Sequence, residues 1–357
     1  MRVPQKILIS YNRFPPIAQE LKEAFENMGI EVRIFFPTDI PVSYFHTLFC
    51  KRMTRWAWRL RLLENSKVLF PNHPGRWENI VAEELLKSYE EFKPDLLLFI
   101  HDPAYGAYGR QILNKIKVPK IGWYVEPFAE ITRLRECSRF MDLYNSFHLK
   151  ALEQLANDQI DTRYLCHAVN PKKFYPIPNI QPEYDLCFVG NFSPWRDEVL
   201  KAALSVTHNI ALYGPGWLKK GRSKIDRETL ATIYKGEQIV GKDLNRLFNT
   251  SRIVLSASRI RNSSGLNMRF FEVLAAGACF LTDAPPELER HFIRDEHLAT
   301  FDNAGELVLK LKELLGDETL RKSIAHAGHE QVMAHHTYEH LAKEFISQYD
   351  SLATKAD

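Results

Sequence analysis

The stretch that decides how this chain folds is Asn262-Ser-Ser-Gly-Leu-Asn-Met-Arg-Phe-Phe-Glu-Val-Leu-Ala-Ala-Gly277, followed by Ala278-Cys-Phe-Leu-Thr-Asp283. It predicts a polar turn, an apolar helix with one acid, a glycine stop and a buried strand. Ser263, Ser264 and Gly265 are residue types that cap the start of a helix. Backbone N–H groups that are free at such a start attract anions, and a phosphate suits them.

Glu272 is the only acid of this predicted helix, and its neighbours Phe271, Val273 and Leu274 are apolar. A carboxylate in such surroundings needs a partner, because burying an unpaired charge is costly. The partner can be a sugar diol, which together with a diphosphate at the helix start gives the layout of a nucleotide-sugar site. It can equally be an arginine such as Arg269 in an ordinary buried helix, and the spacing alone leaves both interpretations open.

A family resemblance is carried by the pattern Gly265-x-Asn267-x-Arg269-x-x-Glu272-x-x-Ala275-x-Gly277 and the apolar strand after it. The pattern resembles the nucleotide-binding segment of GT-B glycosyltransferases, and most closely their CgeB-like (spore-maturation-type) branch, which is similar to the family-four retaining enzymes. The resemblance implies that Glu272 binds the ribose hydroxyls. The first acid of the family's glutamate pair falls at Ser264 here, which leaves the donor sugar and the stereochemical outcome open.

The resemblance continues through the second half of the chain. Phe188-Val-Gly190-Asn-Phe-Ser-Pro-Trp-Arg196 resembles the strand, glycine turn and basic residue that contact the diphosphate. A guanidinium suits that role because it can bind phosphate oxygens in pairs, although Arg196 can also be a surface arginine at a helix start. The residues that the resemblance places at the nucleotide are Gly190, Arg196, Gly214, Gly236, Ser263, Ser264, Gly265, Asn267, Arg269 and Glu272.

The candidate catalytic residues are Arg196 and two residues that follow predicted strands, His101 and Glu126. The resemblance implies that His101 contacts the donor sugar, and Glu126 is a candidate general base or acceptor contact. The alternatives are a strand-end histidine bound to nearby backbone and a helix cap. The sequence contains no Asp-x-Asp pair, so we expect a metal-independent reaction in which arginine and helix N–H groups stabilise the departing diphosphate. We expect no cofactor apart from the donor itself, a UDP-sugar.

Strand-like and helix-like segments alternate along the 357 residues, which predicts parallel α/β layers. The stretch Asn170–Pro182 contains four prolines and no regular period, as a linker does. We therefore predict domains at 1–169 and 184–335, a linker at 170–183 and a final helical segment at 336–357. The resemblance implies the GT-B fold, with two Rossmann-like doubly wound domains facing a central cleft and the last helix returning to the first domain.

Composition excludes several classes of protein. The apolar share of 45% and the charged share of 25% are ordinary globular values, and a net charge of +3 gives no case for nucleic acid. No apolar run reaches membrane-spanning length, and the start lacks the apolar core of a signal peptide. Five scattered cysteines fit a reducing cytoplasm and no metal site. The tail histidines are interpreted as a solvated helix face: His326, His329, His335, His336 and His340.

A basic, aromatic segment at 45–63 forms a further feature. Apolar side chains recur there at helical spacing: Phe45, Leu48, Phe49, Met53, Trp56, Leu60 and Leu63. Cations surround them: Lys51, Arg52, Arg55, Arg59 and Arg61. Such a helix can lie on an anionic membrane as a peripheral contact, bind an anionic acceptor, or simply pack on its own domain with a charged outer face.

The main hypothesis is a cytoplasmic glycosyltransferase that moves a sugar from a nucleotide donor to an acceptor that the sequence does not identify. One alternative is a nucleotide-sugar epimerase or hydrolase of the same fold, which needs a pair of suitably placed acids. The other is a non-catalytic nucleotide-sugar binder, which the serine at position 264 keeps open.

Overall fold

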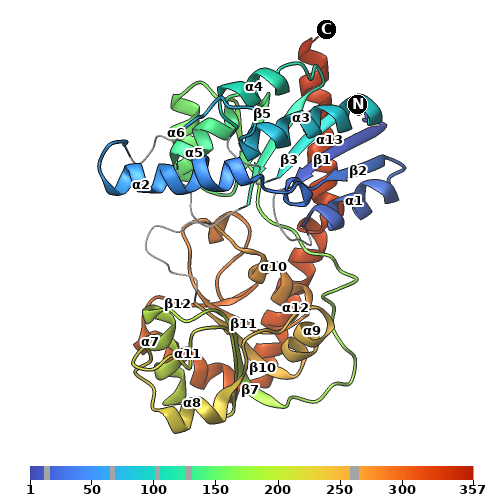
Figure 1. Ribbon diagram of the computed structural model, residues 1–357. Helices are drawn as coiled ribbons and strands as arrows, with labels where there is room; N and C mark the ends of the chain where they lie inside the picture. Colours follow the sequence, from blue (N-terminus) through green and yellow to red (C-terminus); the bar gives the residue numbers. More distant parts are fainter. Residues whose placement is uncertain (12–16, 65–68, 101–104, 126–130, 258–264, 357) are drawn as a thin grey trace. The chain divides into compact units, whose positions relative to one another are not determined.

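Two six-stranded sheets, parallel throughout, organise the chain, and helices lie on both faces of each sheet (Figure 1). The computed structural model describes residues 1–11, 17–64, 69–100, 105–125, 131–257 and 265–356. The chain divides into a first unit, Met1–Leu165 with Leu341–Asp357, and a second unit, Cys166–His340. The predicted α/β class with two doubly wound domains is confirmed.

The first unit has the strand order β2-β1-β3-β4-β5-β6. Its strands are β1 (Lys6–Tyr11), β2 (Glu31–Phe35), β3 (Leu96–Ile100), β4 (Lys120–Tyr124), β5 (Leu143–Ser146) and β6 (Thr162–Tyr164). Its helices are α1 (Ile17–Asn27), η1 (Pro37–Asp39), η2 (His46–Met53), α2 (Thr54–Arg59), α3 (Trp77–Phe92), α4 (Ala107–Leu113), α5 (Ile131–Ser138) and α6 (Leu149–Asn157). Strand β3 is buried along its whole length because helices cover both faces of a parallel sheet.

The last helix, α13 (Tyr338–Ala356), starts in the second unit and belongs to the first from Leu341 onward. The side-chain amides of Asn145 on β5 and Gln348 bond to each other reciprocally, at 2.9 and 3.0 Å. Both residues are buried, so each amide satisfies the other where water cannot. The Trp123 and Phe345 rings meet edge to face beside them. The expected return of the last helix to the first domain is therefore confirmed.

The second unit has the strand order β12-β11-β10-β7-β8-β9. Its strands are β7 (Tyr184–Val189), β8 (Ile210–Tyr213), β9 (Tyr234–Gly236), β10 (Ser251–Ser256), β11 (Phe280–Asp283) and β12 (Ala299–Phe301). Its helices are α7 (Pro194–Leu204), α8 (Arg227–Ile233), α9 (Gly241–Asn249), α10 (Met268–Ala275), η3 (Leu288–Arg290), α11 (Ala304–Gly316) and α12 (Glu318–His335). The order reverses between β7 and β10, the place where open α/β sheets bind ligands.

Alternation along β7 divides the core of this unit into two layers. Leu186 and Phe188 pack with residues of α7, α8 and α11 on one face. Cys187, between them, packs with residues of α9 and α10 on the other face. Period-two burial of this kind fixes the register of the strand, because a shift by one residue would exchange the two layers.

The segment expected as a linker lies against α9 within the second unit. The Asn245 side chain accepts from the backbone N–H of Tyr175 and donates to its carbonyl, both at 3.1 Å. Asn249 accepts from the N–H of Ile177 at 2.6 Å, and the Phe174 ring stacks on Phe248. These bonds give hydrogen-bond partners to backbone groups of a proline-rich stretch that is part of no helix or strand.

The tail histidines do not share one environment. His326 and His335 are exposed, as the solvated-face interpretation requires, but His336 is buried. For His336 the interpretation is wrong, because its ring packs among aromatic rings that include Phe271 and Phe292. Among the helices of the described residues, none combines the length and the apolar character that a membrane span requires.

Candidate functional site

Arg196 joins the two strands at which the order of the second sheet reverses. It lies in the first turn of α7, whose N-cap Ser193 accepts from the Arg196 backbone N–H. Its Nε donates to the carbonyl of Ala257, just after β10, at 2.8 Å. Its Nη1 donates to the carbonyl of Asn191, just after β7, at 2.9 Å. The guanidinium is therefore fixed at the carboxyl ends of both strands.

Two glycines make room for this arrangement. A Cβ on Gly190 would lie 3.2 Å from Nη1 of Arg196, so the guanidinium rests against bare backbone. A Cβ on Gly214 would lie 2.0 Å from the carbonyl oxygen of Gly190, a distance that no side chain can tolerate. The loops after β7 and β8 approach each other this closely because position 214 is glycine, and Arg196 packs on the first loop because position 190 is glycine.

Backbone hydrogen bonds connect these loops into one surface. The N–H of Gly190 donates to the carbonyl of Tyr213, and the N–H of Gly214 donates to the carbonyl of Gly236 at the end of β9. The indole N–H of Trp217 donates to the Gly190 carbonyl at 2.8 Å. Three of the predicted nucleotide residues, at positions 190, 214 and 236, thus belong to one connected edge of the sheet.

A pocket of about 450 Å³ opens on this edge. Its lining residues are Val189, Gly190, Asn191, Tyr213, Gly214, Pro215, Glu237, Gln238, Ile239 and Arg269. The volume falls within the range of small-molecule and cofactor sites. Gly190, Gly214 and Arg269 were predicted at the nucleotide from the sequence, and the structure places all three on one pocket wall.

Helix α10 begins later than the sequence predicts. Its N-cap is Asn267, whose Oδ1 accepts from the backbone N–H of Arg269 at 2.9 Å. Gly265 lies before the cap, and its N–H donates to Oε2 of Glu287 at 2.8 Å. The predicted cap at Ser263–Gly265 is therefore wrong. Asparagine caps helices as well as serine and glycine do, and here Asn267 is the cap. Ser263 and Ser264 lie outside the described residues.

Glu272 pairs with Arg269 one turn away on α10. Nη1 of Arg269 lies 3.0 Å from Oε2 of Glu272. The direction of approach does not give a hydrogen bond, so Nη1 is a buried nitrogen that has no hydrogen-bond partner in the described part of the chain. The guanidinium also lies over the Phe248 ring, 5.3 Å from its centroid. The arginine pairing that the sequence left open is the one present in this structure.

Charged side chains of both signs lie close together beside the pocket. Burial lowers the pKa of Arg196, Asp283 raises it, and the nearby Arg269 lowers it. Arginine remains protonated under such shifts, so two cations stand close enough to repel each other. The buried Asp283 accepts from the indole N–H of Trp195 at 3.0 Å. A bound diphosphate would relieve the repulsion between the two arginines.

Sequence reasoning and structure differ on several site residues. Arg196, Arg269, Gly190 and Gly214 come together around one pocket, and Glu272 reaches it through Arg269. His101 and Glu126, the candidate catalytic residues of the first unit, lie outside the described residues. Four pocket residues were not predicted from the sequence: Tyr213, Glu237, Gln238 and Ile239. Glu287, whose carboxylate accepts from the N–H of Gly265, was not predicted either. The one signal in the sequence was that Tyr213 directly precedes Gly214, which the resemblance places at the nucleotide.

A second polar cluster of this unit has no residue in common with that pocket. The side chains of Cys166, His291 and His336 bring their sulfur and nitrogen atoms within 4.8 Å of one another. Burial lowers the pKa of His291 to about 4 and that of His336 to about 3, and burial raises the pKa of Cys166 to about 12. All three side chains are therefore neutral at pH 7. They offer three ligand atoms, one fewer than a closed structural zinc site has.

Comparisons with known proteins agree with this architecture. Residues 196–347 match the family described as glycosyl transferase-like. Sucrose-phosphate synthase from Thermosynechococcus elongatus superposes with a TM-score of 0.67 at 15% identity, over 98% of this chain and 100% of that one. HepE of Anabaena, in complex with UDP and glucose, gives 0.65 at 11% identity, over 97% and 100%. A glycosyltransferase from Rickettsia africae gives 0.67 at 13% identity, over 98% of both chains.

At these identities the structural likeness shows the fold and nothing finer. A search of curated proteins finds no match to this chain. The family match supports the predicted glycosyltransferase, and it begins at Arg196, the residue that joins β7 to β10. The chain therefore has the GT-B fold, and its residues 196–347 are similar to the glycosyl transferase-like family.

Proposed function

We propose that this protein transfers a sugar from a UDP-sugar donor to an acceptor without using a metal ion. The observation that carries the proposal is the pair Arg196 and Arg269 beside a pocket at the carboxyl ends of β7, β8 and β9. Two fixed cations beside a cavity of nucleotide size are suited to a diphosphate. The solved HepE structures hold UDP, glucose and UDP-glucose, and the likeness of fold makes uridine the first base to test.

The transfer step breaks the bond between the anomeric carbon and the diphosphate oxygen. Negative charge then grows on the leaving UDP, and the acceptor hydroxyl loses a proton as it bonds to the sugar. Arg196 is held by two backbone carbonyls, so it can stabilise that charge without reorganising. Arg269 can exchange its contact with Glu272 for a phosphate oxygen, which frees the Glu272 carboxylate to accept from a ribose diol.

The remaining parts of the proposal rest on the resemblance in the sequence. We assign His101 to the donor sugar and Glu126 to the acceptor hydroxyl as its general base. Membership of the CgeB-like branch and a cytoplasmic location also remain predictions. The acceptor is left as a hydroxyl compound of unknown class.

The test combines binding with turnover. Calorimetric titration with UDP, GDP and dTDP should show the strongest binding for UDP. Sugar transfer from the matching donor, with an extract as acceptor source, should survive EDTA because the two arginines carry the phosphate charge. Strict dependence on added Mn²⁺ or Mg²⁺ would refute the metal-free mechanism. Donor breakdown in buffer alone would favour the epimerase or hydrolase alternative, and tight UDP binding with no turnover would favour the non-catalytic binder.

A further inference from the structure

The basic segment at 45–63 packs on its own unit through a narrow polar stripe. Four residues at helical spacing on η2 and α2 are buried: His46, Cys50, Thr54 and Ala57. None of them is a large apolar side chain. The alternative in which the segment packs on its own domain holds in part, because Phe45, Leu48, Phe49 and Leu63 are half-buried. It fails for Met53, Trp56 and Leu60, which are exposed.

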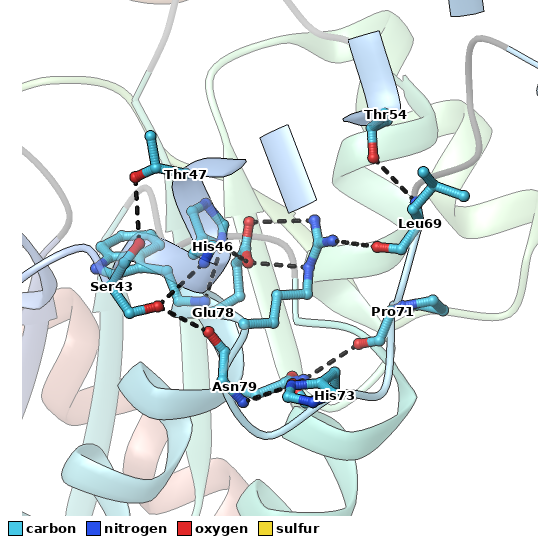
Figure 2. A network of polar contacts seen from close by, with 12 residues as sticks. Ser43, His46, Thr47, Thr54, Leu69, Pro71, His73, Glu78 and Asn79 are labelled. Atoms are coloured by element: carbon cyan, nitrogen blue, oxygen red, sulfur yellow. Dashed lines mark hydrogen bonds and ion pairs between the residues drawn. The ribbon is translucent and has the colours of Figure 1, made fainter. Parts of the chain in front are cut away.

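Hydrogen bonds connect this stripe to residues 69–77 of the same unit (Figure 2). Nδ1 of His46 accepts from the backbone N–H of Trp77, at the start of α3, at 2.9 Å. Oγ1 of Thr54 accepts from the backbone N–H of Leu69 at 3.0 Å. The Ser43 hydroxyl accepts from the His46 N–H and donates to the carbonyl of Gly75. The segment is thus anchored by directional bonds that set which side faces outward.

The side turned away from the domain carries several large apolar groups. Met53, Trp56 and Leu60 follow the i, i+3, i+7 spacing of one helix face. Their exposed fractions are 39%, 62% and 49%, and Leu62 just beyond is 72% exposed. Exposed tryptophan and leucine on one face are costly in water, so such a patch marks an interaction surface.

Cations accompany these apolar groups. Lys51, Arg52, Arg55, Arg59 and Arg61 are all exposed, and within the described residues none of them forms an ion pair. The stretch 43–64 contains a single acid, Glu64. We call the exposed side chains of Met53, Trp56, Leu60 and Leu62 and of these five cations the outer face.

We propose that the outer face binds the surface of an anionic lipid bilayer. Tryptophan and leucine can enter the boundary between headgroups and acyl chains, while arginine and lysine bind the lipid phosphates. A second copy of the same face is a poor partner, because it would bring five cations against five. An anionic polymer would use the cations but gives no account of the exposed apolar row. The proposal is independent of the transferase reaction proposed above.

The experiment measures co-sedimentation of the full chain with two kinds of vesicle. One is phosphatidylcholine alone, and the other is phosphatidylcholine mixed with phosphatidylglycerol. Binding should appear with the mixed vesicles only and should weaken as NaCl is raised, because salt screens the charges. Each substitution in the set Arg52→Gln, Arg55→Gln and Arg59→Gln should lower the partition coefficient about fivefold. Trp56→Ser combined with Leu60→Ser should lower it about tenfold or more.

Matched controls come from the second unit. Leu309→Ser with Leu218→Ser removes apolar side chains that are 69% and 55% exposed, and should leave vesicle binding unchanged. Lys219→Gln with Lys220→Gln removes exposed cations and should do the same. Melting temperatures verify that every variant is folded. Since the altered side chains are exposed, unfolding of Trp56→Ser would itself contradict the proposed exposure.

Three outcomes would overturn the proposal. The first is absence of binding to either vesicle, and the second is binding that the apolar substitutions leave intact. In the second case, equal binding to a single-stranded oligonucleotide would identify the face as a general polyanion site. The third is a dimer in light scattering that Trp56→Ser converts to a monomer, which would assign the face to a second copy of the chain.

Discussion

Helix α10 and the segment His46–Arg59 place their side chains in opposite ways. Helix α10 buries five apolar residues and directs its charged pair, Arg269 and Glu272, to the pocket edge. The segment His46–Arg59 buries a histidine and a threonine and leaves Trp56 exposed. The sequence predicts a helix with recurring apolar side chains in both places. An apolar stripe therefore tells which residues share a face, and the neighbouring polar partners decide whether that face turns inward.

The largest expected effect tests the inward face of α10. Phe271 is fully buried beside Phe292 and His336, so Phe271→Ala should lower the free energy of unfolding by about 3–5 kcal/mol. Trp56→Ala, at the corresponding stripe of the other segment, should change it by less than about 0.5 kcal/mol. Urea unfolding followed by fluorescence measures both. If both substitutions lowered the free energy of unfolding equally, Trp56 would be as closely packed as Phe271. The difference between the two regions would then be contradicted.

The second prediction concerns the anion pocket beside α10. Arg196→Ala should lower kcat for sugar transfer about 100-fold, because it removes a fixed donor to the departing diphosphate. Arg246→Ala is the matched control, since Arg246 is an exposed arginine that pairs with Glu183. Steady-state kinetics on both variants give the comparison. A normal kcat for Arg196→Ala would leave the guanidinium a purely structural connection between β7 and β10.

The third prediction concerns the acid of α10. Glu272→Ala should weaken binding of UDP by about 2 kcal/mol, the scale of losing a charged hydrogen-bonding partner. Calorimetry on Glu272→Ala and on the exposed control Glu228→Ala measures the change. The ion pair with Arg269 gives the opposite expectation if it persists in the complex, because removing Glu272 would then free Arg269 for phosphate and tighten binding. Unchanged or tighter binding of UDP by Glu272→Ala would contradict the assignment of Glu272 to the ribose.

The smallest effect is expected from pH. The folded-state pKa of His336 is about 3, against an ordinary value of 6.5, because the ring is buried beside Phe271. Below pH 6.5 the His336 ring therefore binds a proton in the unfolded chain, whereas in the folded chain it stays neutral down to about pH 3. Stability is complete above that pH and should fall by about 1–2 kcal/mol from this group between pH 7 and pH 5. His336→Gln should flatten the decline in urea unfolding at these two pH values, and an unchanged slope would exclude His336 as its source.

Strands and long helices were predictable from the sequence because their signals are local. The buried strand that the sequence predicts within Ala278–Asp283 is β11, Phe280–Asp283, in the structure. Strands β9 and β12 were missed, since three residues are too few to show an alternation. The cap of α10 was misplaced because three cap-forming residue types precede Asn267.

The site was predictable where chemistry and spacing agree, and not where contacts are distant in sequence. Arg196, Arg269 and Glu272 were predicted from their residue types and from the family resemblance of the segments that contain them. The bond from Gly265 to Glu287 spans 22 residues, and no local pattern announces it. The outward turn of Trp56 depends on bonds of His46 and Thr54 to residues 31 and 15 positions away. The spacing of apolar residues in the sequence does not show such partners.

The reciprocal amide pair of Asn145 and Gln348 has a consequence for the order in which the protein is made. The first unit contains residues from both ends of the described chain, whereas the second is one continuous stretch, Cys166–His340. During synthesis the second unit can therefore complete its sheet while Asn145 still waits for a partner that is not yet translated. The native packing of β5 can therefore be completed only after residue 348 has been translated, although β5 itself is translated before the whole of the second unit.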